Sequence, residues 1–209
     1  MARSKSSKRW LDEHFSDPFV KKAHAEGHRS RAVYKLMQIQ TKYHLLKPGM
    51  VVVDLGAAPG SWSVFAKQCV GRIGQVIALD ILPMTPIDGV IILQGDFGEE
   101  AALAELRTAL NGRTVDAVIS DIAPNTSGNP AIDQPRAMLL AELALEFARE
   151  VKVSVFITKL LHGSEFDVYL KTLRQDFKRV ILFKPEASRD RSREVYALCH
   201  LTKGNLENK

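Results

Sequence analysis

Short apolar runs alternate with helical patterns along the chain from Met50 onward. Several of these runs are continuously apolar and rich in β-branched residues, as expected of strands that are buried on both faces. The predicted strands are Val51–Asp54, Gln75–Asp80, Val90–Gln94, Val115–Asp121, Val153–Lys159, Arg179–Phe183 and Glu194–Leu201. The predicted helices between them are Ser61–Val70, Glu99–Leu110, Asp133–Val151 and Glu165–Phe177. This alternation predicts an α/β fold, with a mostly parallel sheet and helices on both faces.

The first fifty residues carry no strand pattern. Arg31–Tyr43 has apolar residues on one face and predicts a helix, whereas residues 1–9 are polar and basic and predict disorder. We therefore expect a basic, partly disordered N-terminal extension over residues 1–30 and one α/β domain over residues 31–209. A chain of 209 residues is long enough for one such core and too short for two comfortable ones.

Composition narrows the class of protein. No apolar run approaches the ~20 residues that a membrane span needs, and the basic N-terminus lacks the apolar stretch of a secretory signal. Cys69 and Cys199 are the only cysteines, which gives neither a disulfide framework nor metal-ligand spacing. Of the histidines, only His24 and His28 have ligand-like spacing, and no third ligand stands nearby. We expect a cytoplasmic protein without a metal site or a membrane contact.

Charge is distributed unevenly around a formal net value of +5. Residues 1–35 hold nine Lys or Arg against four Asp or Glu, and residues 171–193 hold eight against three, so each segment carries +5. The stretch between them holds ten against fifteen, which is −5. Basic segments attract phosphate backbones, although they can also be ordinary solvated helix faces. The charge pattern thus favours a nucleic-acid partner without requiring one.

A candidate cofactor loop follows the first strand, with the sequence Asp54-Leu55-Gly56-Ala57-Ala58-Pro59-Gly60. Small residues between a strand and a helix let a ligand approach the backbone closely. The middle glycine of a dinucleotide fingerprint is absent, and no Gly-Lys-Ser/Thr follows, so neither a dinucleotide nor a nucleoside triphosphate loop is indicated.

Carboxylates close four neighbouring strands: Asp54, Asp80, Asp96 and Asp121. Each one alone could be a helix cap. Together they predict a lined cleft, in which Asp80 accepts from ribose hydroxyls and Asp96 from an adenine amino group. An acidic cleft suits a cationic sulfonium better than a pyrophosphate.

Six segments together resemble the FtsJ (RrmJ) family of bacterial RNA methyltransferases. They are Asp-Leu-Gly-Ala-Ala-Pro-Gly, Leu-Asp-Ile-Leu-Pro-Met, Gln-Gly-Asp-Phe, Ser-Asp-Ile-Ala-Pro-Asn, Arg-Ala-Met and Ser-Arg-Glu-Val-Tyr. The resemblance spans essentially the whole chain. It implies a Rossmann-like class I methyltransferase fold, with a seven-stranded sheet whose last strand is inserted antiparallel. It further implies transfer of a methyl group from S-adenosylmethionine to a uridine 2′-oxygen in 23S ribosomal RNA of the large ribosomal subunit.

The resemblance also assigns site residues. It implies a catalytic tetrad, Lys35, Asp121, Lys159 and Glu194, and cofactor contacts from Gly60, Trp62, Asp80, Asp96 and Asp121. A lysine can take a proton from a ribose hydroxyl only after its pKa falls below the ordinary ~10.4. We expect Lys159 to be the general base, Lys35 to orient the ribose, Asp121 to hold Lys159, and Glu194 to position the hydroxyl or the lysines. The expected RNA-facing residues are Lys5, Lys8, Arg9, Arg29, Arg31 and Arg189–Arg193.

Two departures from the family pattern bear on these assignments. Between Glu150 and Phe156 the chain is about two residues shorter than a Leu-x-Pro-Gly-type turn and has no Gly or Pro, which leaves the placement of the fifth strand open. Ser61 stands where a second glycine is usual.

Two alternative functions stay open: methylation of transfer RNA or of messenger RNA caps, and a non-catalytic role in ribosome assembly, against which the complete tetrad argues. We expect a monomer.

Overall fold

A computed structural model of the chain describes residues 17–124, 128–189 and 192–202. The predicted disorder of residues 1–9 and the predicted RNA-facing side chains of Lys5, Lys8, Arg9 and Arg191 lie outside these residues.

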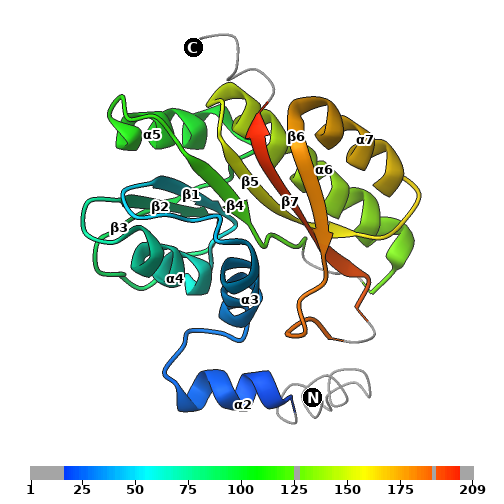
Figure 1. Ribbon diagram of the computed structural model, residues 1–209, viewed down its shortest axis with the longest axis horizontal. Coiled ribbons are helices and arrows are strands. Elements are labelled where there is room, and N and C mark those ends of the chain that lie inside the picture. The colour runs from blue at the N-terminus through cyan, green and yellow to red at the C-terminus, as the bar shows by residue number, and fades with distance from the viewer. Residues whose placement is uncertain (1–16, 125–127, 190–191, 203–209) are drawn as a thin grey trace, which may run out of the picture.

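The described chain forms one seven-stranded sheet in the order β3-β2-β1-β4-β5-β7-β6 (Figure 1). The strands are β1 (Val51–Leu55), β2 (Gln75–Asp80), β3 (Val90–Gln94), β4 (Ala117–Ser120), β5 (Val155–Leu161), β6 (Phe177–Phe183) and β7 (Glu194–Thr202). Strands β1 to β5 pair in parallel, and β7 pairs antiparallel with both β5 and β6. The predicted fold class, including the antiparallel last strand, is confirmed.

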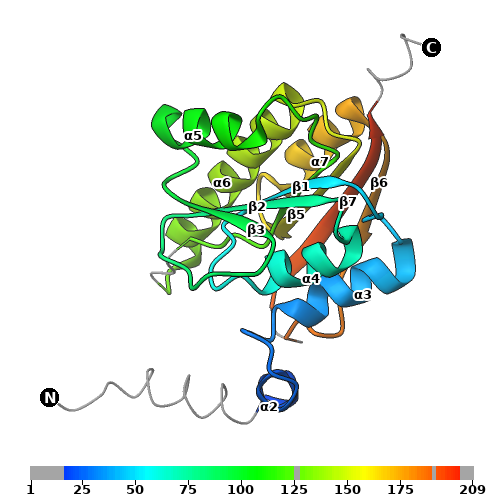
Figure 2. The ribbon, with the colours of Figure 1, turned by 90° about the vertical axis from the view of Figure 1, so that its left-hand side faces the viewer.

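Helices cover both faces of the sheet (Figure 2). One face carries α5 (Glu100–Leu110), α6 (Pro130–Glu150) and α7 (Phe166–Asp176), and the other carries α3 (Val33–Tyr43) and α4 (Ser61–Val70). The two layers bury separate apolar clusters, because successive residues of each strand point to opposite faces. In β1, for example, Val51 and Val53 face the first group of helices, and Val52 faces the second.

A further helix, α2 (Pro18–Ala25), lies in the region expected to be an extension. Asp17 caps it, since its carboxylate accepts from the backbone N–H of Phe19 at 2.9 Å, and a proline occupies the first turn. Ala23 packs with Val33 and Tyr34 of α3 in a small apolar cluster. The sequence pattern did not predict this helix, because only one of its eight residues is buried.

Asp116 joins the starts of three strands at the amino-terminal edge of the sheet. Its side chain accepts from the N–H of Val51 at 2.8 Å, and its own N–H donates to the carbonyl of Val51 at 2.9 Å. Its carbonyl accepts from the N–H groups of Ser154 and Val155 at 3.1 and 3.0 Å. The alignment of β1, β4 and β5 is therefore fixed before any of them reaches the other edge.

The short turn between α6 and β5 closes with Lys152 in the left-handed conformation, at φ 53°. The N–H of Val153 donates to the carbonyl of Ala148, and that of Lys152 to the carbonyl of Arg149, both at 3.1 Å. These two bonds form a Schellman motif, in which glycine usually takes the left-handed position. A lysine thus makes the turn for which Gly or Pro was expected, and Lys159 keeps its place within β5.

Lys152→Gly should stabilise the protein, because the Cβ of an L-residue is strained in this conformation. Relief of that strain outweighs the added flexibility of the unfolded chain, so we expect a gain of about 0.5–1 kcal/mol, or a melting temperature about 1–3 °C higher for a chain of this length. Chemical and thermal unfolding measure it. Lys152→Ala removes the charge but keeps the Cβ, and equal stability of the two variants would contradict the explanation.

Candidate active site

The carboxyl ends of β4 and β5 and the start of β7 bring the predicted tetrad together. Asp121 follows β4 directly, and Lys159 lies near the end of β5. Because β7 runs antiparallel to β5, its first residues lie at that same end, with Lys159 opposite Tyr196 and Leu161 opposite Glu194. Lys35 reaches the group from α3.

One carboxylate oxygen, Oδ1 of Asp121, is the centre of this arrangement. It accepts from the hydroxyl of Tyr196 at 2.5 Å, from Lys159 Nζ at 3.2 Å and from Lys35 Nζ at 3.5 Å. Lys159 Nζ also donates to the backbone carbonyl of Asp121 at 2.7 Å. Lys35 Nζ lies 3.0 Å from Glu194 Oε1, which completes the tetrad.

The four side chains of the tetrad are largely shielded from solvent, but none of them is completely buried. They expose between 9% (Lys159) and 16% (Asp121) of their surface. Burial raises the pKa of Asp121, but the ammonium groups of Lys159 and Lys35 and the Tyr196 hydroxyl lower it further, so the net pKa lies below the ordinary value. Asp121 is therefore ionised at neutral pH.

Tyr196 is a member of this site that the sequence analysis missed. Burial, together with the carboxylates of Asp121 and Glu194, raises its pKa well above the usual range, so the hydroxyl keeps its proton and acts as a donor. The signal was present, because Glu194 and Tyr196 are two residues apart and must face the same side of a strand. Its ring packs against that of Trp62, with centroids 5.6 Å apart.

A cavity of about 320 Å³ opens beside the tetrad and matches the predicted cofactor cleft. It is lined by polar and apolar residues from the ends of β1 to β4, which include Asp80, Asp96 and Asp121. Ile81, Leu82, Phe97, Ile122 and Leu140 provide apolar walls. This mixture of apolar walls and a few polar groups is typical of sites for small organic ligands.

Two of the lining carboxylates also organise the loops around the cavity. Asp80 accepts from the N–H groups of Ala58 and Leu82, both at 2.8 Å, and so ties the loop after β1 to the loop after β2. Asp96 accepts from the N–H of Gly98 at 2.9 Å. The same two side chains thus accept from backbone N–H groups and line the cavity.

A smaller cavity of about 40 Å³ continues towards α3 and shares Gly56, Ala58 and Asp121 with the larger one. Trp62 lines it and is nearly fully buried, with its indole N–H donating to the carbonyl of Ala32 at 2.8 Å. Gly60 caps α4 at φ 95°. Its predicted cofactor contact stays a prediction, since neither cavity has Gly60 in its lining.

Asp54 lines the smaller cavity and is almost fully buried in β1. Its carboxylate accepts from the Ser63 hydroxyl at 2.6 Å. Burial is the main cause that raises its pKa to about 7; Ser63 opposes the rise, and the charges of Asp121 and Asp80 add to it. The charges of Asp121 and Asp80 thus add to the cost of ionising Asp54.

Among the described residues, no group of three or more His, Cys, Asp or Glu could hold a metal ion. In the same part of the chain, no helix is long and apolar enough to cross a membrane.

Two of the predicted RNA-facing arginines are engaged inside the protein. Arg31 pairs with Asp17 and donates to the carbonyl of Ala187, with 16% of its side chain exposed, and its predicted contact with RNA stays a prediction. Arg29 donates to three backbone carbonyls of the loops around the cleft. Arg193 is exposed and Arg189 is half-buried, where it contacts Asp17 at 3.5 Å.

Asp54→Asn should stabilise the protein increasingly as pH rises. The folded state favours the protonated form of Asp54. The stability that this preference contributes is lost as pH rises from the unfolded pKa of about 4 through the folded pKa of about 7. Asparagine has no such loss, so the gain over wild type should grow across this window by as much as about 4 kcal/mol. Urea unfolding at several pH values measures it. Asp88→Asn, at an exposed position, is the control, and a gain independent of pH would contradict the explanation.

Comparison with known proteins identifies the family of the chain. The profile of the FtsJ-like methyltransferase family matches residues 28–201. The chain is 54% identical over 200 residues to the ribosomal RNA large subunit methyltransferase E of Cellvibrio japonicus, covering 95% of both chains. It is 58% identical over 198 residues to the protein of the same name from Stenotrophomonas maltophilia, covering 94% of both.

A solved structure described as a ribosomal RNA methyltransferase of Plasmodium falciparum superposes with a TM-score of 0.75 at 27% identity, covering 84% of this chain and 98% of that one. The relatives and the solved structure are all described as ribosomal RNA methyltransferases. The chain belongs to the FtsJ-like methyltransferase family, and S-adenosylmethionine is its methyl donor.

Proposed function

We propose that this enzyme transfers a methyl group from S-adenosylmethionine to the 2′-oxygen of a uridine ribose in 23S ribosomal RNA of the large ribosomal subunit. The observation that carries the proposal is the convergence of Lys35, Lys159 and Tyr196 on Asp121, at the border of a cleft that fits the methyl donor. The names of relatives that are more than half identical over nearly their whole length support the ribosomal substrate.

The residues around the cleft fit S-adenosylmethionine. When bound, this cofactor supplies an electrophilic methyl group on a positively charged sulfur. Asp80 would accept from the ribose hydroxyls and Asp96 from the adenine amino group, while Asp121 would border the methyl group. The carboxylates of Asp80, Asp96 and Asp121 in the lining of the cleft also favour a cation over a pyrophosphate.

Lys159 is the proposed general base. It would take the proton of the ribose hydroxyl as the oxygen bonds to the methyl carbon and the carbon–sulfur bond breaks. An ammonium group has no lone pair, so Lys159 must lose a proton before it can act. Its two bonds to Asp121 hold the nitrogen at a fixed place, and Lys35, bridging Asp121 and Glu194, would orient the ribose. In-line positioning of the oxygen and the methyl group supplies much of the rate enhancement.

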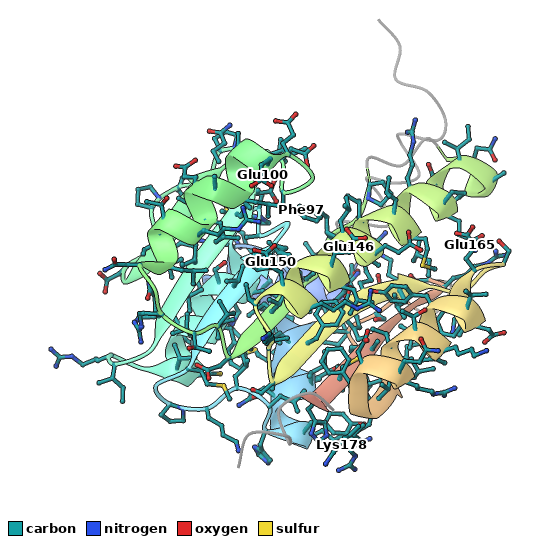
Figure 3. The ribbon with its side chains drawn as sticks, turned by 90° about the horizontal axis from the view of Figure 1, so that it is seen from above. Phe97, Glu100, Glu146, Glu150, Glu165 and Lys178 are labelled. Atoms are coloured by element: carbon teal, nitrogen blue, oxygen red, sulfur yellow. The ribbon has the colours of Figure 1, made fainter. Side chains whose placement is uncertain are left out.

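Charge on the surface favours one side for the RNA. Exposed glutamates lie on α5 and α6, where Figure 3 labels Glu100, Glu146 and Glu150. Arg107 pairs with Glu100 at 2.6 Å and with Glu150 at 2.7 Å, but the remaining carboxylates would repel phosphates. The proposed RNA surface is therefore the β6–β7 loop, which carries Arg189 and Arg193.

The proposed setting is a monomer in the cytoplasm that acts without a metal ion. Cys69 and Cys199 are both free thiols, as a reducing compartment allows. Methylation of transfer RNA or of a messenger RNA cap needs the same chemistry and is the enzymatic alternative. A non-catalytic assembly factor could dispense with Lys159, whose bonds to Asp121 speak against that role.

Transfer of a labelled methyl group to unmodified large ribosomal subunits tests the proposal, beside free ribosomal RNA and transfer RNA. Lys159→Ala should lower transfer by about 10²–10⁴-fold, the usual contribution of a general base. Lys47→Ala changes an exposed lysine of the loop between α3 and β1 and should retain full activity. Label at a uridine 2′-oxygen of 23S ribosomal RNA is expected. Label on transfer RNA alone would discard the ribosomal substrate, and no transfer with the cofactor bound would favour the assembly factor.

Tyr196→Phe should slow transfer about tenfold, because the loss of one hydrogen bond to a charged group, of about 1.5–3 kcal/mol, leaves Asp121 less firmly placed. The two lysines still hold Asp121, so we expect the Kd for S-adenosylmethionine to stay within about twofold. Single-turnover rates and cofactor titration measure both quantities. Tyr43→Phe, at the far end of α3, is the matched control. An unchanged rate would mean that the hydroxyl only fills space.

A further inference from the structure

The backbone loops that enclose the cofactor cleft are joined by one side chain outside it, that of Arg29. Its Nη1 donates to the carbonyls of Pro59 and Thr85, both at 3.0 Å, and its Nη2 donates to the carbonyl of Pro86 at 2.7 Å. Pro59 belongs to the loop between β1 and α4, whereas Thr85 and Pro86 belong to the loop between β2 and β3. A planar guanidinium fork can hold three acceptors in one fixed arrangement.

Both of these loops contribute to the cofactor site. Gly56 and Ala58 line the larger cavity from the first loop, and Ile81 and Leu82 line it from the second. The contact between the loops is close, because a Cβ added to Gly60 would lie 2.6 Å from Cδ1 of Ile87 and 3.4 Å from Nη1 of Arg29. Arg29 therefore joins, from outside the cleft, the same two loops that Asp80 joins from within it.

Two of the residues that follow Arg29 line the smaller cavity, which adjoins the cofactor cleft. The hydroxyls of Ser30 and Ser61 are 2.8 Å apart, and the carbonyl of Ala32 accepts from Trp62. Ser30 and Ala32 line the smaller cavity together with Asp121. From the other side, Arg31 fastens the segment to Asp17 and Ala187. Residues 29–32 are thus held at both ends and form part of the cofactor site.

We infer that Arg29 is a positioning residue for S-adenosylmethionine, and not a contact for RNA. It acts through Pro59 and the 85–86 backbone, so its loss should weaken cofactor binding and leave the transfer chemistry intact. Arg29→Ala should raise the Kd and the KM for S-adenosylmethionine about tenfold or more. Arg29→Lys keeps the charge but not the fork, and should raise them about threefold.

The split between KM and kcat is the decisive readout, because a general loss of folded protein would lower kcat without changing KM. The kcat at saturating S-adenosylmethionine and the affinity for large ribosomal subunits should both stay within twofold of wild type. Arg113→Ala is the matched control, since Arg113 also bonds protein acceptors, Gln75 and the carbonyl of Ile73, but at the opposite edge of the sheet. It should change none of these quantities.

The inference rests on the proposed cofactor site, and the Kd is measured by calorimetry without RNA, so its outcome is independent of which RNA is methylated. If Arg29→Ala does not fold, Arg29→Lys decides the question through the same KM and kcat comparison. A Kd for S-adenosylmethionine within twofold of wild type in the folded variants overturns the inference. Weaker binding of large subunits at an unchanged cofactor Kd also overturns it, and would return Arg29 to the RNA surface.

Discussion

The active site depends on one partly buried carboxylate. Asp121 would be costly to shield from water without its donors, and Lys35 and Lys159 would repel each other without the carboxylate between them. The hydroxyl of Tyr196 adds a neutral donor to the same oxygen. Since these groups come from α3, β4, β5 and β7, a single oxygen atom joins four elements that are far apart in the sequence.

The topology of the sheet brings the proposed cofactor cleft next to the proposed transfer residues. Strands β1, β2 and β3 end in the loops of the cofactor cleft, whereas β5 and β7 supply the proposed transfer residues. β4 lies between the two groups, and Asp121, directly after it, lines both cavities. The antiparallel direction of β7 matters here, because a parallel strand would start at the opposite edge of the sheet and carry Glu194 away from Lys159.

The sequence predicted the elements whose physical signal is local. Continuous β-branched runs placed β2 and β3 at their observed bounds, and the family pattern named side chains that the fold brings together. The sequence did not predict α2, because its short polar pattern resembles a loop. It also did not predict the left-handed conformation of Lys152, because composition does not reveal the backbone angles of one residue. The arginines show the same limit: a sequence shows that Arg31 is charged, but not that Asp17 already neutralises it.

The hydrogen bonds of Asp116 give the active site a second source of alignment. They fix the starts of β1, β4 and β5 at one edge of the sheet, and strands of about five residues carry that alignment some ~15 Å to the other edge. Asp121 and Lys159 would therefore stay opposed even if the charge on one of them were removed. The backbone that holds the tetrad does not need the tetrad to keep its shape, so a neutral substitution there changes the chemistry while leaving the geometry of the scaffold in place.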